Sequence, residues 1–177
     1  WNENLSEDMV ISVNFTLNQV SGSIFMDGIF KALDETKVNP KNIVLEISNG
    51  GEVTDMEATA KKLSAIKTFG LRIAIDNFDS ERSSVESLYN LPVDIVKIDR
   101  QHVLGIENDA KNQNFITNII NVAEMADVKV FAEGVETLEQ AKLLWDMGIS
   151  CLQGYYFSRP IYFEQFEAIY RKQEGAE

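Results

Sequence analysis

The chain has 177 residues, of which 45% are hydrophobic and 25% are charged, as is ordinary for a globular protein. This length suits one domain with its own core, or most of a larger domain. The formal net charge of −12 argues against a nucleic-acid-binding surface, which needs a basic face. The charge fits clustered carboxylates that bind a cation, and it equally fits solvated helix surfaces.

The rare residue types narrow the classes further. A single cysteine, Cys151, excludes an internal disulfide and suits a reducing compartment, so we expect a cytoplasmic location. A single histidine, His102, excludes a zinc site built from several histidines. No apolar stretch is long enough to cross a bilayer and no signal peptide is visible, so we expect no membrane insertion of this segment. The chain begins with Trp1, and we therefore expect it to be part of a longer protein.

Strand-like and helix-like patterns alternate along the chain. The first apolar run, at residues 10–14, precedes a helical pattern at Phe25–Thr36, and the run at 43–46 precedes one at 55–69 that Gly70 ends. The run at 71–76 precedes a short helical pattern at 83–88, and the run at 94–97 precedes one at 112–125. The run at 129–133 precedes a helix that Thr137 and Gln140 begin as a capping box, and the run at 150–153 precedes a helix at 163–172.

Each strand-like run is apolar in its body and ends on an acid, an amide or a cation. These six residues are Asn14, Glu46, Asp76, Lys97, Glu133 and Gln153. Because helices separate the runs, we expect a parallel sheet whose carboxyl ends meet at one edge. Ligand-binding residues gather at that edge in β/α folds. The pattern therefore predicts an oxygen-rich site.

The alternation fits either an open doubly wound sheet or part of a barrel. No glycine-rich phosphate loop follows any of the runs, which weakens the nucleotide-binding doubly wound alternative. No linker or low-complexity segment divides the chain, so we expect a single domain over residues 1–177.

The strand-end motifs resemble those of the EAL-domain family, the cyclic di-GMP phosphodiesterases of bacteria. The similar stretches occur in the same order as in the family: SVNFT at 12–16, LEIS at 45–48, AIDNF at 74–78, LPVDIVKIDR at 91–100, FAEGVET at 131–137 and QGYYFSRP at 153–160. The resemblance implies an α/β fold, a (β/α)₈ TIM-like barrel. Here about six βα units are present, and the two strands that precede residue 14 in the family are missing.

The resemblance also implies a metal-dependent site that uses Mg²⁺ or Mn²⁺. By position, Lys97 and Glu133 match catalytic residues, although these roles are expected to be vestigial here. Asn14, Glu46 and Asp76 match metal ligands, and Glu136 matches a supporting carboxylate grouped with them. Gln153, Tyr155 and Pro160 match substrate-binding positions. Hard cations prefer such oxygen ligands, and paired metals lower the pKa of a bridging water.

A purely structural interpretation of these residues stays open. Asn14 suits a loop cap, and Tyr155 suits a core or rim position. The acids at 46, 76 and 133 suit ion pairs with Lys97, a common arrangement for one lysine among several carboxylates. Several buried carboxylates side by side are costly without a cation, and this cost favours the metal interpretation.

Departures from the family pattern predict a degenerate site. The name-giving Glu-Ala-Leu strand is missing, and Asn77 replaces the second aspartate of the family's DDFG motif. Asn49 replaces a second acid that follows Glu46, and Asp79 and Glu81 replace loop glycines. We therefore expect weak or no metal binding and no phosphodiesterase activity.

We expect the chain to act as a regulatory or interaction module of a cytoplasmic signalling protein, or as a receptor for cyclic di-GMP. The alternative is an active phosphodiesterase whose missing strands the parent chain supplies. That parent is expected to carry sensor or GGDEF domains, and a membrane-bound sensor with this segment on its cytoplasmic side is one form that it could take. A six-stranded part of a barrel has two open edges, so we also expect a homodimer or another association through them.

Overall fold

The computed structural model describes residues 9–48, 55–78 and 91–174. Its strands form one parallel sheet: β1 (Ile11–Thr16), β2 (Ile43–Ser48), β3 (Arg72–Phe78), β4 (Ile95–Ile98), β5 (Lys129–Ala132) and β6 (Cys151–Leu152). The strands lie in the sheet in the same order as in the chain. Every crossover thus advances in one direction, as in a TIM-like barrel, whereas a doubly wound sheet reverses at a switch point. The barrel alternative is confirmed.

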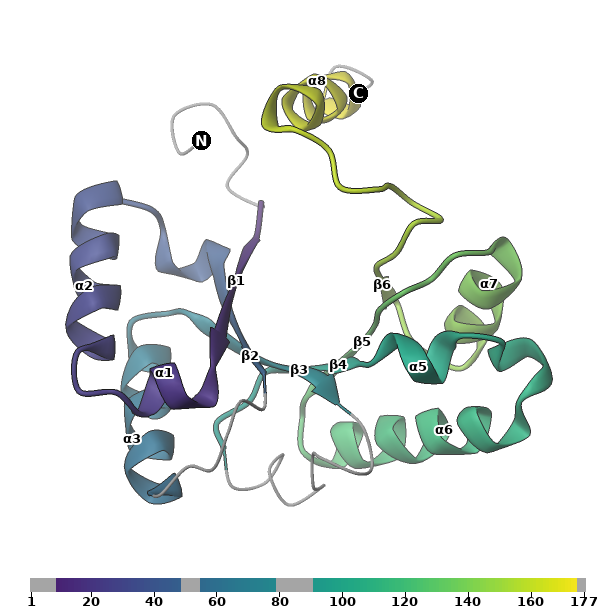
Figure 1. The fold of residues 1–177 in the computed structure, drawn as a ribbon, viewed down its shortest axis with the longest axis horizontal. Coiled ribbons are helices and arrows are strands. Elements are labelled where there is room, and N and C mark those ends of the chain that lie inside the picture. Colours follow the sequence, from purple (N-terminus) through teal and green to yellow (C-terminus); the bar gives the residue numbers. More distant parts are fainter. Residues whose placement is uncertain (1–8, 49–54, 79–90, 175–177) are drawn as a thin grey trace.

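Helices cover the outer face of the curved sheet (Figure 1). The described helices are α1 (Leu17–Ser21), α2 (Phe25–Thr36), α3 (Met56–Thr68), α5 (Arg100–Val103), α6 (Ala110–Met125), α7 (Leu138–Asp146) and α8 (Phe163–Glu174), with short 3₁₀ turns at Pro40–Asn42 and Ile106–Asn108. Helix α8 lies on the open side of the sheet, away from the other helices (Figure 1).

Two of the predicted helices have the end signals that the sequence indicates, and Asp55 adds a cap that was not predicted. The Asp55 carboxylate caps α3 by accepting from the N–H of Ala58 at 2.8 Å, and Gly70 follows the helix with a φ of 101°. Thr137 and Gln140 form the predicted capping box of α7. The predicted helix at 83–88 lies outside the described residues. The short α1 and α5 were not predicted, because five and four residues do not establish a periodic pattern.

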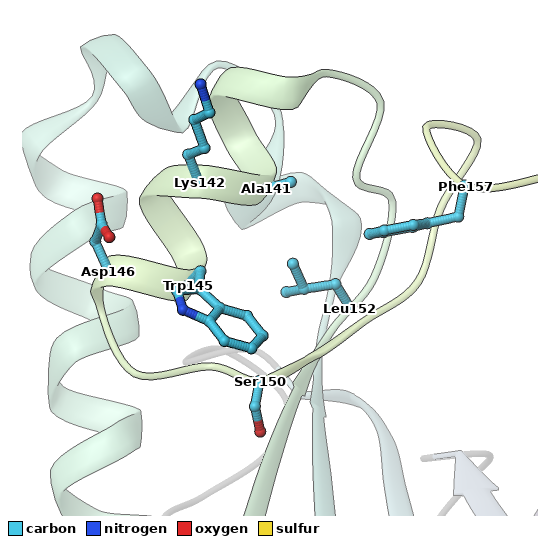
Figure 2. A pocket seen from close by; sticks show the side chains of 7 residues that line it. All are labelled: Ala141, Lys142, Trp145, Asp146, Ser150, Leu152 and Phe157. Carbon is cyan, nitrogen blue, oxygen red and sulfur yellow. The ribbon is translucent and has the colours of Figure 1, made fainter. Parts of the chain in front are cut away.

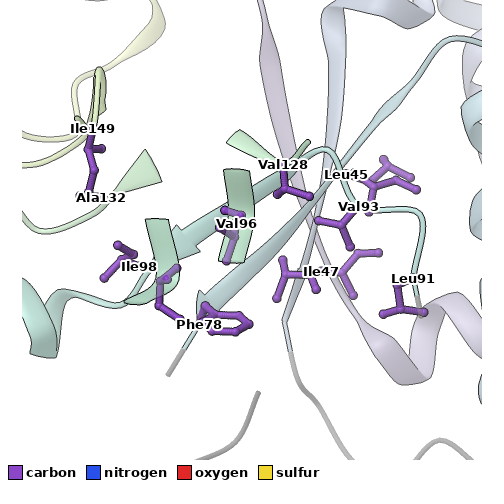
Figure 3. Close-up of a cluster of buried hydrophobic side chains, with 14 of the residues drawn as sticks. Leu45, Ile47, Phe78, Leu91, Val93, Val96, Ile98, Val128, Ala132 and Ile149 are labelled. Carbon is purple, nitrogen blue, oxygen red and sulfur yellow. The ribbon is translucent and has the colours of Figure 1, made fainter. Parts of the chain in front are cut away.

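The main core lies between the sheet and its outer helices. Alternate strand residues point to opposite faces, and Leu45, Ile47, Val96 and Ile98 face the helices (Figure 3). Burying one such side chain contributes about 1.5–3 kcal/mol. The inner face carries a smaller apolar cluster of Val44, Ala74 and Ile95, with Phe131 packed against it. This inner cluster, called the floor below, lies on the same face of the sheet as the polar strand ends.

Candidate metal and nucleotide site

The strand pattern places the polar residues one step above the inner apolar floor. Along a strand, residues two positions apart share a face. Glu46, Asp76, Lys97 and Glu133 each come two residues after a member of the floor, in the pairs 44/46, 74/76, 95/97 and 131/133. Four neighbouring strands thus deliver one lysine and three acids to the carboxyl end of the same inner face.

A buried lysine joins two of these acids. Lys97 is only 3% exposed, and its Nζ lies 2.8 Å from Oε2 of Glu46. The same ammonium forms an ion pair and a hydrogen bond with Oε1 of Glu133. Both carboxylates are themselves largely buried, so they depend on this cation to offset the cost of leaving water.

The three acids converge closely enough to share an ion. Glu46, Asp76 and Glu133 each offer a carboxylate oxygen, and these oxygens all lie within 4.8 Å of one another. Carboxylate oxygens are the ligands that hard divalent cations take. The set therefore suits one divalent cation, for which the ammonium of Lys97 is the competing positive charge. A second ion would need a further carboxylate.

The residue next to Asp76 supplies an amide instead of that carboxylate. The backbone N–H of Asn77 donates to Oδ1 of Asp76 at 2.9 Å, and its side-chain Nδ2 donates to Oδ2 at 2.7 Å. Asn77 has a φ of 52°, in the left-handed region that asparagine tolerates, and the β3–β4 register shifts between Ile75 and Phe78. At this local irregularity the backbone N–H and the side-chain amide of Asn77 each donate to one oxygen of Asp76.

Burial and charge shift the ionisation of the cluster. Burial raises the pKa of Glu133 and of Asp76 above their ordinary values, although Lys97 opposes both shifts. Burial also acts to lower the pKa of Lys97, but its hydrogen bonds with Glu133 and Glu46 outweigh burial and hold that pKa above its ordinary value. At neutral pH the lysine is therefore a permanent cation in the site.

The other predicted ligands are not members of the three-acid group. Asn14 is exposed on β1 and stands in register with Glu46, so it faces the same side of the sheet. Glu136 accepts a hydrogen bond from Nη2 of Arg100 at 2.5 Å and is not part of the three-acid group. Asn49, Asp79 and Glu81 lie outside the described residues.

A pocket of about 220 Å³ adjoins the acid cluster through Glu133. Its lining includes the predicted substrate-binding residues Gln153 and Tyr155, both exposed, and the unpredicted Arg100; the other lining residues are Gly134, Glu136 and Gly154. The guanidinium of Arg159 lies 5.0 Å from the centre of the Tyr155 ring. The predicted Pro160 is exposed in the following loop and does not line this pocket.

A second pocket, of about 470 Å³, lies outside the barrel between α7 and β6 (Figure 2). Trp145, Leu152 and Phe157 line it, with Lys142 and Asp146 on α7 (Figure 2). None of the three clustered acids lines it. The smaller inner pocket is therefore the one associated with the polar strand ends.

Arg100 is the residue that sequence reasoning missed. It directly follows the strand motif that contains Lys97, and its partner Glu136 is 36 positions away. Only a parallel neighbour relation between β4 and β5 brings the two loops together. The sequence does contain a signal for this pair, because a basic residue follows one predicted strand and an acidic residue follows the adjacent one.

This chain is thus an α/β barrel-type domain with an acidic, lysine-bridged site at the carboxyl ends of its strands. A sequence profile of the EAL domain matches residues 1–160, and the chain belongs to the EAL-domain family. Signaling protein YkoW of Bacillus subtilis is 31% identical over 160 residues, covering 90% of this chain and 20% of YkoW.

Solved structures agree with the family. The EAL domain of Mycobacterium smegmatis DcpA superposes with a TM-score of 0.90 at 27% identity, covering 96% of this chain and 76% of that one. Klebsiella pneumoniae BlrP1, in its manganese and cyclic di-GMP complex, superposes with a TM-score of 0.77 at 26% identity, covering 85% of this chain and 39% of that one. The predicted family and fold are confirmed, and the chain is an EAL domain of cyclic di-GMP signalling proteins.

The chain spans between a fifth and a third of the length of its curated relatives. The activities of those whole proteins are therefore not carried over directly. Among the described helices, none combines the length and the apolar character needed to cross a membrane.

Proposed function

We propose that this EAL domain binds cyclic di-GMP without hydrolysing it at an enzymatic rate, and acts as a regulatory receptor module. The observation that carries this proposal is the pair of hydrogen bonds from Asn77 to Asp76, in which the backbone N–H donates to Oδ1 and the side-chain amide donates to Oδ2. Two paired ions lower the pKa of a bridging water and clamp the phosphoryl oxygens. Carboxylates are the charged oxygen ligands that hold such ions. At position 77 the side chain is a neutral amide, so no carboxylate is available there beside Asp76.

The charge balance of the site supports the same proposal. Lys97 already neutralises two of the three clustered acids through direct ion pairs. A divalent cation would have to bind beside this buried ammonium, and the two positive charges would repel each other. We infer weak binding of a single Mg²⁺ or Mn²⁺ ion at Glu46, Asp76 and Glu133, with Asn14 and Glu136 at most as supporting ligands.

Retained binding is supported by the pocket beside the acids. BlrP1 and PaMucR, both similar in structure to this chain, were solved in complexes with cyclic di-GMP. In this chain Gln153 and Tyr155 line a pocket of about 220 Å³, together with Glu133, the ion-pair partner of Lys97. A lysine and a polar strand end suit a phosphate, and an aromatic ring suits a stacked base.

One observation favours the second candidate, an active metal-dependent phosphodiesterase that converts cyclic di-GMP to pGpG. Three acids and a lysine still converge on one point, with carboxylate oxygens within 4.8 Å of each other. This arrangement would suffice if the parent chain supplied the remaining ligands.

Titration calorimetry with cyclic di-GMP tests the receptor proposal. We expect saturable binding whose affinity changes less than about threefold when Mg²⁺ is replaced by a chelator, because the ammonium of Lys97 already serves as the cation among the clustered acids. The linear hydrolysis product of cyclic di-GMP, pGpG, serves as the control ligand and should bind more weakly. The absence of any saturable heat with cyclic di-GMP would refute the receptor proposal.

We further propose a cytoplasmic parent protein that carries sensor or GGDEF domains, and association of this chain through its sheet edges. Within the described residues, β1 and β6 each pair with one strand only. Such edges carry unpaired backbone groups that recruit other strands. The exposed Val10 and Val13, at 45% and 39%, add apolar surface at the β1 edge.

Light scattering on the purified 177-residue chain measures this association. We expect a mass above that of the 20.0 kDa monomer, rising with concentration. Placing lysine at the β1 edge with Val13→Lys should lower the association, since edge lysines oppose strand pairing. A monomer at all concentrations, with one cooperative thermal transition, would show that the edges do not associate.

A further inference from the structure

The pocket beside the acid cluster contains an ion pair that the acid cluster does not use. Arg100 opens α5 after β4, and Glu136 follows β5, so the pair joins the loops after two neighbouring strands. The two side chains are 55% and 34% exposed, so ligand atoms can reach both. Tyr155, which follows β6, lines the same pocket.

We propose that Arg100 and Glu136 recognise the Watson–Crick edge of one guanine base of cyclic di-GMP, a proposal that rests on the receptor function above. This edge presents an acceptor, O6, beside two donors, N1–H and the 2-amino group. The guanidinium of Arg100 offers donors only, and the carboxylate of Glu136 offers acceptors only. Held side by side, the two groups present a donor next to acceptors, which is the complement of guanine.

The observed hydrogen bond leaves the required atoms available. It uses Nη2 of Arg100 and Oε1 of Glu136. In the part of the chain that the structure describes, the remaining N–H groups of this guanidinium and Oε2 of this carboxylate have no other partner. An adenine edge places a donor, its 6-amino group, where guanine has O6, so it would face the guanidinium with like polarity.

The surrounding backbone fixes the pair in place. Gly134 has a φ of 71°, and a Cβ there would lie 2.2 Å from Cγ of Arg100, so the arginine stem lies directly over this glycine. The N–H of Glu136 donates to Oε1 of Gln140 at 2.7 Å. A Cβ on Gly154 would lie 2.1 Å from the carbonyl oxygen of Val135, so the loop after β6 packs closely on the loop after β5. Preorganised polar groups discriminate between bases better than mobile ones.

The size of the pocket suits one base. Its volume of about 220 Å³ is below the roughly 300–1,000 Å³ of pockets for drug-sized ligands. The Tyr155 ring at its wall supplies a surface for stacking. The phosphates would then lie toward Glu133, which lines the pocket and forms an ion pair with Lys97.

A binding comparison with cyclic di-GMP and cyclic di-IMP tests the proposal, because hypoxanthine differs from guanine only by lacking the 2-amino group. We expect the unaltered chain to prefer cyclic di-GMP by roughly tenfold, in line with the discrimination of a good bidentate contact. In Glu136→Gln, which loses one acceptor, the preference should fall to about twofold or less.

The matched control is Glu167→Gln in the Arg171–Glu167 pair of α8, whose side chains are 63% and 32% exposed. It removes a similar charge away from the pocket and should leave the preference unchanged. Thermal unfolding of both variants verifies that they are folded. An unchanged preference in Glu136→Gln, or equal affinity of the unaltered chain for both ligands, would show that the pair only links two loops. Binding of neither ligand would refute the receptor function as well.

Discussion

Replacing Lys97 by methionine should lower the free energy of unfolding by about 3–5 kcal/mol at pH 7, the usual cost of removing one partner from a buried ion pair. Methionine keeps the length and apolar stem of the side chain but removes the ammonium that Glu46 and Glu133 share. Two buried carboxylates, with a third from Asp76 close by, would then lack a counter-charge.

The loss should depend on pH in a defined direction. The pKa of Glu133 and that of Asp76 are raised by burial, so the folded state binds their protons more tightly than the unfolded state does. The stability that these two groups contribute is therefore fully present below their ordinary values of 4.5 and 3.8, and it is lost as the pH rises through the raised values. Without Lys97 both raised values should rise further, so the variant should recover stability on acidification.

Urea unfolding of both proteins between pH 4.5 and 8 measures this effect. Lys31→Met is the control, because Lys31 is 75% exposed and lies 3.8 Å from Glu35 on the surface. Its expected cost is under about 1 kcal/mol, as for other exposed pairs. A Lys97→Met cost as small as that of the control, or a cost that grows on acidification, would contradict the buried ion-pair cluster.

The raised pKa of Lys97 sets the alkaline limit of the same cluster. Stability from a raised lysine pKa is fully present below the ordinary value of 10.5 and is lost only as the pH rises through the raised value. The ion pairs of Lys97 should therefore persist across the neutral range.

The repeated pattern of the chain made most of the fold predictable. Short apolar runs that end on a polar residue, separated by amphipathic segments, fix the parallel sheet and the side of it on which Glu46, Asp76, Lys97 and Glu133 meet. Local end signals such as Gly70 and Thr137 indicated where helices end and begin. Both kinds of signal lie within a few residues of the elements that they specify.

The details of the site depend on geometry that no local pattern contains. The sequence indicates that Lys97 pairs with nearby acids, and it does form ion pairs with two of them, Glu46 and Glu133. Which two acids it reaches depends on the stagger of the strands. The left-handed backbone of Asn77 and its two hydrogen bonds to Asp76 follow from a register shift against β4. The Arg100–Glu136 pair joins residues 36 positions apart.

The absence of hydrolysis is the second large effect that we expect, and it follows from the ligands of the acid cluster. Residues of a metal site act together, so removing several of them lowers the rate by several powers of ten rather than in proportion. The family resemblance predicts an acid at position 77 and another at position 49, and the chain has asparagine at both. Restoring one carboxylate with Asn77→Asp should therefore not produce robust turnover.

The most direct measurement is the formation of linear pGpG from cyclic di-GMP with excess Mn²⁺, followed by chromatography for the unaltered chain and for Asn77→Asp. We predict turnover below about 10⁻³ s⁻¹ for both, far under the range of roughly 1–10³ s⁻¹ that is typical of enzymes. A Mn²⁺-dependent rate of about 1 s⁻¹ or more in the unaltered chain would show that Glu46, Asp76, Glu133 and Lys97 suffice for catalysis, and would contradict the receptor account.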